Sequence, residues 1–174
     1  MLVLREGLAA IQDFLEMGGP VVQIILMVLV LMWTCIFERL WYFRRVYPRD
    51  RRRIVQTWNE QLDRTSWYAS QIRFLMISRV KMKLRSSLPV IHALVAICPL
   101  LGLLGTVTGM IEVFDVMALS GSGNARAMAS GVSRATIPTM AGMVAALSGL
   151  YFSTSMERFA SLESQRLADS LVHR

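Results

Sequence analysis

The sequence PLLGLLGTVTG, residues 99–109, decides the fold because it lies in a long stretch without a charged side chain. Charged residues are absent from 86–111, a window of 26 residues, and also from 17–37 and 135–156. An α-helix needs ~20 mostly apolar residues to cross a hydrocarbon core ~30 Å thick. Of the 174 residues 54% are apolar and 18% charged, so three such windows leave little sequence for a separate soluble domain. The windows predict an all-α polytopic membrane protein with three transmembrane helices. They exclude a secreted enzyme, a disulfide scaffold and a disordered chain.

Basic residues concentrate between the first two apolar windows, where 13 of the 19 Lys and Arg residues lie within 39–85. Short segments rich in Lys and Arg stay on the cytoplasmic side of a membrane, so we expect an outside N-terminus and an inside C-terminus. The net charge of +7 also raises the possibility of nucleic-acid binding. Anionic lipid headgroups explain the cluster of Arg51, Arg52 and Arg53 more simply. We therefore expect anionic lipids as partners and no nucleic acid.

The organisation along the chain follows from the breaks between these windows. Gly18, Gly19 and Pro20 should break or bend a helix just before the first span. The helix of that span should continue to Tyr47, before Pro48. We expect one domain over 1–174, with an outer amphipathic helix at 1–17, a first span at 18–40, a cytoplasmic helical segment at 41–87, a second span at 88–117, a periplasmic loop at 118–130, a third span at 131–156 and a cytoplasmic tail at 157–174.

Small residues recur along the second and third spans. Gly105 and Gly109 form a GxxxG pair, a spacing that lets helix backbones approach closely in lipid. Three spans cannot bury this much small-residue surface on themselves, so we infer a homo-oligomer. The residues expected to serve helix packing are Pro99, Gly102, Gly105, Gly109, Pro138 and Gly142.

Hydroxyl side chains at membrane depth are a second clue. Thr106 and Thr108 lie on the second span, and Thr136 and Thr139 on the third. Each hydroxyl could simply bond the carbonyl three or four residues back in its own helix. Around a central axis, Thr106 and Thr139 could instead form rings of mild polarity that hold water. Both interpretations stay open from the sequence.

No Asp, Glu, Lys or Arg occurs near the middle of any span, although a proton carrier needs a titratable group there. If protons cross here, another chain should supply the carrier. Glu112 and Asp115 fall towards the outer end of the second span and could form an acidic vestibule. His92 lies near the inner boundary and suits packing better than proton transfer. We find no arrangement of residues for catalysis, metal binding or a cofactor, and expect no enzyme activity.

Two segments together resemble a known family. PLLGLLGTVTG at 99–109 and GVSRATIPTMAGMVAAL at 131–147, with three spans and an outside N-terminus, are similar to the ExbB/TolQ/MotA stator proteins, and most like ExbB. The resemblance is strong over 89–156 and rests on topology alone for the first span.

The resemblance implies a pentameric ring around a pore in the bacterial inner membrane. Within the ring, a single-span partner like ExbD or TolR carries the aspartate that takes up the proton. The pore threonines of the family fall on Thr106 and Thr139. Where relatives often have a glutamate, this chain has Arg134, which could lie at the outer mouth of the pore.

The implied function is to use the proton motive force to energise TonB-dependent outer-membrane uptake, such as iron-siderophore import, through a TonB-like transducer. A TolQ-like role in envelope maintenance and a non-conducting membrane scaffold remain alternatives. A flagellar stator fits less well, because it would normally have four spans and a larger cytoplasmic segment.

Overall fold

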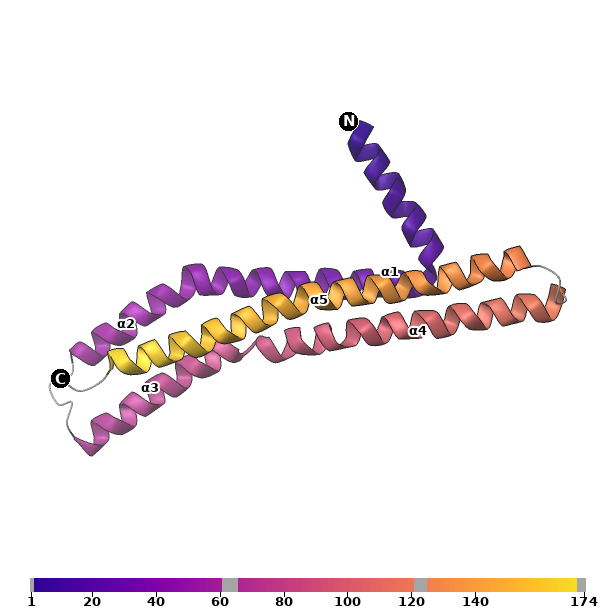
Figure 1. The fold of residues 1–174 in the computed structure, drawn as a ribbon. Helices are drawn as coiled ribbons and strands as arrows, with labels where there is room; N and C mark the ends of the chain where they lie inside the picture. Colours follow the sequence, from indigo (N-terminus) through magenta and orange to yellow (C-terminus); the bar gives the residue numbers. More distant parts are fainter. Residues whose placement is uncertain (1, 61–65, 121–124, 172–174) are drawn as a thin grey trace. The chain divides into compact units, whose positions relative to one another are not determined.

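The computed structural model describes residues 2–60, 66–120 and 125–171, with side chains described for 18–60, 66–118 and 128–171. The described residues are almost entirely helical and contain no strand, which confirms the all-α fold class. The elements in chain order are α1 (Leu2–Trp41), the π-helical turn η1 (Tyr42–Val46), α2 (Tyr47–Asn59), α3 (Trp67–Arg85), α4 (Leu88–Ser120) and α5 (Ala125–Ser170) (Figure 1).

Three helical stretches of the described chain are long and apolar enough to cross a membrane. They are Gly18–Asn59, Trp67–Ala118 and Met128–Ser170, and each overlaps one of the three windows without charge. The chain is therefore a multi-pass membrane protein. The outer amphipathic helix expected at 1–17 coincides with the first part of the α1 backbone, and its side chains lie outside the described residues.

The chain divides into two compact units, which we describe separately. Unit 1 comprises Met1–Met32 and Ala93–Gly149, so it holds the apolar parts of α4 and α5. Unit 2 comprises Trp33–His92 and Leu150–Arg174, so it holds η1, α2, α3 and the second half of α5.

In unit 1 the helix α1 is broken where the sequence predicts a break. Gly19 has φ 66° and ψ −167°, a backbone conformation that residues with a Cβ rarely adopt. Pro20 follows directly and lacks the amide hydrogen that a continuing helix would use. The GGP motif thus separates the apolar helix that begins at Pro20 from the residues before it.

In unit 2 the helix of the first span does not end at Tyr47, as the sequence had suggested. It passes through η1 and continues as α2 to Asn59. Pro48 cannot donate a backbone hydrogen bond, and the helix compensates with a wider turn in which the Tyr47 amide donates to the Tyr42 carbonyl. The wider turn keeps Arg39, Phe43 and Tyr47, which are spaced by four residues, buried together on one side.

The remaining helix ends are set by local features of the sequence, and those of α5 differ from the expected bounds. The Ser66 hydroxyl caps α3 by accepting the Tyr68 amide hydrogen at 3.4 Å. Ser86 and Ser87 separate α3 from α4, which begins at Leu88, the predicted start of the second span. Helix α5 begins at Ala125, inside the segment expected to be a loop, and it continues through the predicted tail to Ser170.

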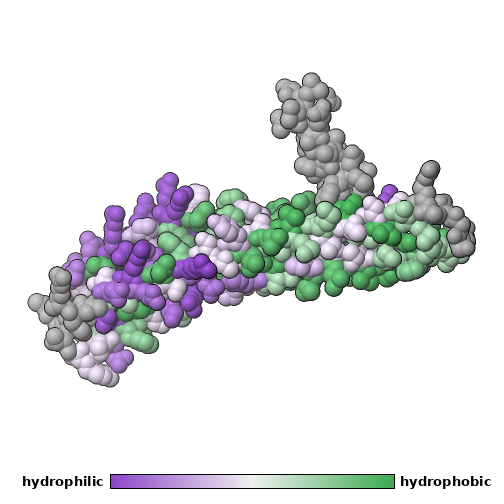
Figure 2. All heavy atoms as spheres, viewed as in Figure 1, coloured by the Kyte–Doolittle hydropathy of each residue, from purple (hydrophilic) through white to green (hydrophobic). Residues whose placement is uncertain are grey.

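The surface of the charged helices differs from that of the apolar helices. In Figure 2 hydrophilic side chains gather over α2 and α3, while hydrophobic side chains cover the visible face of α4 and α5 in unit 1. Many of the exposed residues of unit 1 are large and apolar, including Leu103, Val107, Phe114, Met143 and Val144. Such a surface needs lipid or other protein chains around it.

Candidate functional site

The α4–α5 contact in unit 1 is a site where two helix backbones approach each other closely. We call it the small-residue contact, formed by Gly102, Gly105 and Gly109 of α4 and Ala135, Pro138 and Gly142 of α5. A Cβ added to Gly142 would lie 2.5 Å from the Cys98 carbonyl oxygen, and one added to Gly109 would lie 2.9 Å from the Ala135 Cα. Distances this short leave no room for a side chain, so the helices meet backbone to backbone.

The two prolines of these helices differ in their position. Pro138 is buried, and its ring occupies the space where a Cβ of Gly105 would lie. Pro99 is exposed in the single chain, and its packing against other subunits stays a prediction. The structure places the other five predicted packing residues at this contact.

Thr139 differs from the other predicted threonines in the partner of its hydroxyl. Its Oγ1 donates across the contact to the Gly102 carbonyl oxygen on α4, at 2.9 Å. Because Gly102 lacks a side chain, Thr139 can approach its backbone. The hydroxyl keeps lone pairs that can still accept a hydrogen bond.

The other three threonines bond within their own helices. Thr106 donates to the Leu103 carbonyl at 2.7 Å, and Thr136 donates to the Ser133 carbonyl at 2.8 Å. Thr108 lies 3.1 Å from the carbonyls of residues 104 and 105. The bonds of these three follow the local alternative that the sequence had left open.

Thr106 also borders a shallow groove on α4, next to Met110 and Phe114, with a volume of about 320 Å³. The Thr106 residue thus lies at this shallow groove on α4, whereas the Thr139 hydroxyl lies between α4 and α5. A shared pore lining by the two residues stays a prediction.

The predicted vestibule residues Glu112, Asp115 and Arg134 are all exposed. Within the described part of the chain, none of the three takes part in an ion pair. They are thus accessible to water or to another chain, and their role stays a prediction.

Unit 2 contains buried charge that the sequence reasoning missed. Arg39 is 4% exposed, donates from Nη2 to the Lys83 carbonyl, and lies 4.9 Å from the ring centres of both Tyr42 and Phe43. Glu163 is 6% exposed, and its carboxylate lies 2.7 Å from Arg166 and 3.9 Å from Arg51. The spacing of four residues between Arg39, Phe43 and Tyr47 in the sequence could have indicated that Arg39 is buried.

Tyr47 connects α2 to α5 beside this charge. Its hydroxyl donates to the Glu163 backbone carbonyl at 3.3 Å. The residue lies ten positions beyond the end of the first apolar window, outside the hydrocarbon core. Burial, and then the charge of Glu163, raise the pKa of Tyr47 to about 12, so the phenol stays protonated and keeps donating at neutral pH.

His92 lies near the start of α4 and pairs with Glu157 of α5, at 3.5 Å between Nε2 and the carboxylate. Both side chains are partly exposed to solvent. This pair belongs to unit 2, and the packing role expected for His92 stays a prediction.

The described residues show no group of three or more His, Cys, Asp or Glu side chains that could hold a metal ion. Cys35 and Cys98 are both free. The chemistry that this geometry offers is therefore that of hydroxyls, backbone carbonyls and a tight helix contact.

Comparison with known proteins identifies the family of this arrangement. Residues 52–169 match the MotA/TolQ/ExbB proton channel family, and this range includes α3, α4 and nearly all of α5. The chain belongs to this family. The family consists of membrane proton-channel proteins that assemble with stator partners. The small-residue contact and all four threonines lie in the matched range.

Two proteins from Synechocystis sp. are similar to the chain, and the first extends the likeness beyond that range. "Putative biopolymer transport protein ExbB-like 1" is 30% identical over 198 residues, which covers 95% of this chain and 76% of the relative. A second protein, with the same name but numbered 3, is 33% identical over 90 residues, covering 48% of this chain and 43% of its own length. Both support the resemblance to ExbB that the sequence motifs indicated. No solved structure matches the chain.

Proposed function

We propose that this chain is the ring-forming subunit of an inner-membrane complex that uses the proton motive force to energise TonB-dependent uptake across the outer membrane. The observation that carries the proposal is the chemistry of its spans. The windows 86–111 and 135–156 hold hydroxyls and small residues and contain no Asp, Glu, Lys or Arg. Such spans can line a path for protons but offer no charged side chain near the middle of the membrane to carry one, so a partner must contribute the titratable group there.

The proposed assembly is a pentamer around one or two helices of an ExbD-like partner with an intramembrane Asp. The exposed apolar surface of unit 1 is available for contact with other subunits as well as with lipid, and the proposed assembly would cover part of it. The likeness to two proteins named as ExbB-like supports an ExbD-like partner over a TolR-like one. A TonB-like transducer would then pass the motion to an outer-membrane transporter.

In the proposed cycle, a proton enters past Glu112, Asp115 and Arg134 and neutralises the partner's Asp. The free hydroxyl lone pairs of Thr139, and those of Thr106, Thr108 and Thr136, give the proton and its water a polar path. Neutralisation lets the partner helix move relative to the ring. Each charge that crosses 100 mV supplies ~2.3 kcal/mol, so one step does a small amount of work.

The small-residue contact gives this cycle a rigid wall. Gly102 and Gly142 hold α4 and α5 together at backbone distance, and the Thr139 hydroxyl joins them with a hydrogen bond. A wall that does not deform makes the neutralised partner helix, rather than the ring subunit, the part that moves.

Native mass spectrometry of the tagged chain, purified gently with its bound proteins, tests the assembly. We expect five copies of this chain with a small single-span protein that carries an intramembrane Asp. An ExbD-like partner supports uptake, whereas a TolR-like partner would replace uptake with envelope maintenance. A lone chain, or copies without such a partner, would leave a non-conducting scaffold and contradict the proposal.

Growth on an iron-siderophore as the only iron source tests the path. Thr139→Val keeps the shape of the side chain and removes its hydroxyl, and we expect it to abolish growth while the complex still assembles. Thr154→Val is the matched control, because Thr154 has no part in the proposed path, is exposed and bonds only its own helix. Normal growth of the Thr139→Val strain would contradict a role of this hydroxyl in the path.

A further inference from the structure

Helix α3 carries a row of large apolar side chains that its own chain leaves uncovered. They are Trp67, Tyr68, Phe74, Leu75 and Met82, and each is between 63% and 75% exposed. At about 100° per residue, these five positions fall within roughly 120° of the helix circumference. The buried residues Ala69, Val80 and Leu84 lie on the opposite side of the helix. We call the exposed row the outer stripe of α3.

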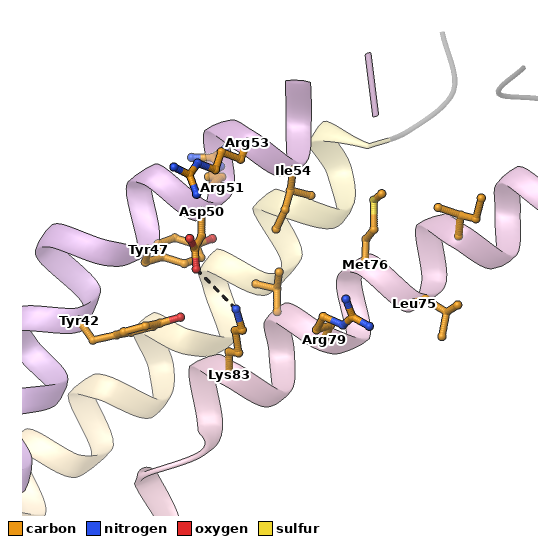
Figure 3. Close-up of a pocket in the computed structure, with 12 residues that line it drawn as sticks. Tyr42, Tyr47, Asp50, Arg51, Arg53, Ile54, Leu75, Met76, Arg79 and Lys83 are labelled. Atoms are coloured by element: carbon orange, nitrogen blue, oxygen red, sulfur yellow. Dashed lines mark ion pairs between the residues drawn. The ribbon is translucent and has the colours of Figure 1, made fainter. Parts of the chain in front are cut away.

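The inner side of α3 lines a pocket together with α2. The pocket has a volume of about 450 Å³, and α3 contributes Ile72, Met76 and Val80 to it (Figure 3). In Figure 3 Met76 and Leu75 extend in different directions from α3. Leu75 borders the pocket and still has 63% of its surface exposed. The packing of α3 in its own chain therefore occupies the inner side and leaves the outer stripe open.

Much of the outer stripe lies too far from the membrane for lipid to cover it. Phe74 lies about 18 Å along the helix before Ser86, where the second apolar window begins. A contact supports this level, because Arg73 donates to the Ala168 carbonyl of α5 at 3.0 Å. Ala168 itself lies about 18 Å past Met156, where the third window ends. Lipid headgroups reach only roughly 5–8 Å beyond the hydrocarbon core.

Apolar side chains of this size outside a membrane need a protein surface to cover them. The proposed ring offers one, because its copies share one orientation and place equal distances from the membrane side by side. In a closed ring each copy meets its two neighbours through two different faces. The outer stripe should therefore meet another part of unit 2 in the next copy, at the same distance from the membrane.

Charge argues against two of the faces that the next copy could offer. Helix α3 contains no Asp or Glu but five basic residues, Arg73, Arg79, Lys81, Lys83 and Arg85. The outer side of η1 and α2 exposes five more, Arg44, Arg45, Arg49, Arg52 and Arg53. Contact of α3 with a second α3, or with η1 and α2, would bring like charges together, which disfavours an interface.

The outer side of α5 has the opposite charge. Outside the membrane it exposes the carboxylates of Glu157 and Asp169. It also exposes Arg158 and Arg166, but Arg166 is already paired with the Glu163 carboxylate at 2.7 Å. This side of α5 therefore offers net negative charge to the cations of α3.

Apolar side chains of α3 and α5 also lie at matching levels. Leu162 of α5 is 53% exposed and lies about 9 Å past Met156. Phe159 is 39% exposed and lies about 5 Å past the same residue. Met82 of the outer stripe lies about 6 Å before Ser86, so in neighbouring copies it reaches the level of both.

We propose that the outer stripe of α3 packs against the outer side of α5 in the next copy, with Met82 beside Leu162. The cations of α3 then face Glu157 and Asp169 of that copy. Because the two faces differ, the contact repeats head to tail, and a closed ring leaves no stripe uncovered. The inference rests on the proposed ring and deepens it, since it names the surface through which neighbours meet outside the membrane.

Cross-linking between two differently tagged copies tests the contact. Both copies carry Cys35→Ala and Cys98→Ala, which remove the native thiols. One copy also carries Met82→Cys and the other Leu162→Cys. The two are expressed together, purified in an uncharged detergent and treated with a short bismaleimide. A second pair farther from the membrane, Leu75→Cys with Gln165→Cys, repeats the test should the first pair weaken the assembly.

The matched control replaces Met82→Cys by Arg44→Cys. Arg44 is exposed and lies about 10 Å past Phe37, the end of the first apolar window, so it shares the level of Leu162. It differs in belonging to η1 instead of α3. We expect a covalent dimer that contains both tags from the Met82 and Leu162 pair, and none from the control.

Each other result overturns the interface in its own way. Dimers with one tag, formed by Met82→Cys alone, would show that the stripes of two copies meet each other. Dimers with both tags in the control would place η1 and α2 at the contact. No dimer from either test pair, while native mass spectrometry still finds the ring, would assign the stripe to another protein.

The same mass measurement separates this interface from the proposed function. A ring that persists without the expected cross-link rejects the α3–α5 contact and leaves the proposed assembly standing. An unmodified chain that is found only as a monomer rejects the assembly itself.

Discussion

The two units of this chain hold their helices together in opposite ways. In unit 1, α4 and α5 meet through glycines, and a single added Cβ at Gly142 would collide with a backbone carbonyl. In unit 2, the helices meet through large and charged side chains. Phe43 packs against Phe159 with ring centres 5.0 Å apart and ring planes tilted by 42°, and Arg39 is buried against two rings.

The difference follows from what surrounds each unit. Inside a bilayer, lipid tails are as apolar as any side chain, so helices gain little by burying large residues and associate through close backbone packing. Beyond the hydrocarbon core, water restores the hydrophobic effect, and large side chains gain by leaving it. Substitutions that add atoms should therefore destabilise unit 1, and substitutions that remove atoms should destabilise unit 2.

The largest effect should come from Gly142→Leu. Adding methylenes to a packed site typically costs about 1–3 kcal/mol, and the cost should be higher here because the obstacle is the Cys98 carbonyl rather than a movable side chain. We expect loss of the folded protein in detergent, measured by size-exclusion chromatography and thermal unfolding. Val144→Leu, at an exposed position two residues away, is the control and should behave like the unmodified chain. A stable Gly142→Leu protein would contradict backbone-to-backbone packing.

Removal of atoms should have the next largest effect, and in unit 2. Phe43 is 6% exposed, and Phe43→Ala should destabilise the protein by about 3 kcal/mol through the lost ring contacts and the cavity left behind. Phe43→Leu, which keeps most of the volume, should cost less than about 1.5 kcal/mol. Denaturant titration followed by circular dichroism measures both values. An equal loss of stability in the two variants would show that the volume of the side chain at position 43 does not determine stability.

Tyr47 gives unit 2 a response to alkali. Its pKa is raised to about 12 in the folded chain, against an ordinary value of 10.0, so the folded state favours the protonated phenol. The contribution to stability is complete below pH 10 and is lost as the pH rises through 12. Tyr47→Phe removes this group, so the stability of the variant should fall less than that of the unmodified chain as the pH rises from 10 to 12, as measured by thermal unfolding at stepped pH. An unmodified chain and a variant that lose stability in parallel would refute the assignment.

The smallest effect on stability should come from Thr139→Val. The variant loses one hydrogen bond to the Gly102 carbonyl, and such bonds between membrane helices contribute about 0.6 kcal/mol on average. We expect a slightly lower unfolding midpoint than that of Thr136→Val, which loses only a bond within its own helix. A loss of several kcal/mol would mean that the main role of Thr139 is to stabilise the fold. Growth of the Thr139→Val strain would then have to be compared with that of Thr139→Ser, which keeps the hydroxyl.

The sequence predicted unit 1 better than unit 2, for a physical reason. Long windows without charge and recurring glycines have few interpretations, so the spans and most of the close helix contacts could be inferred from residue types alone. The partner of the Thr139 hydroxyl could not, because a threonine in a helix satisfies its hydroxyl equally well with its own backbone. Only the register of α4 against α5 determines whether the Thr139 hydroxyl bonds its own helix or the Gly102 carbonyl of α4.

Unit 2 was harder because its key residues act through distant contacts. Arg39 belongs by sequence to the end of a span, and only the tertiary structure brings the Lys83 carbonyl to it. Pro48 suggested the end of a helix, yet a π-helical turn absorbs it and α2 continues. The pocket between α2 and α3 likewise depends on how residues far apart in the chain pack, which no local pattern encodes.

The central claim is that this chain forms the wall of a proton path whose titratable group belongs to another chain. Proton uptake into liposomes under an imposed potential tests it directly, with this chain alone, with its single-span partner, and with the partner's intramembrane Asp replaced by Asn. We predict uptake only for the complex with the intact Asp. Uptake by this chain alone at the rate of the complex would contradict the claim.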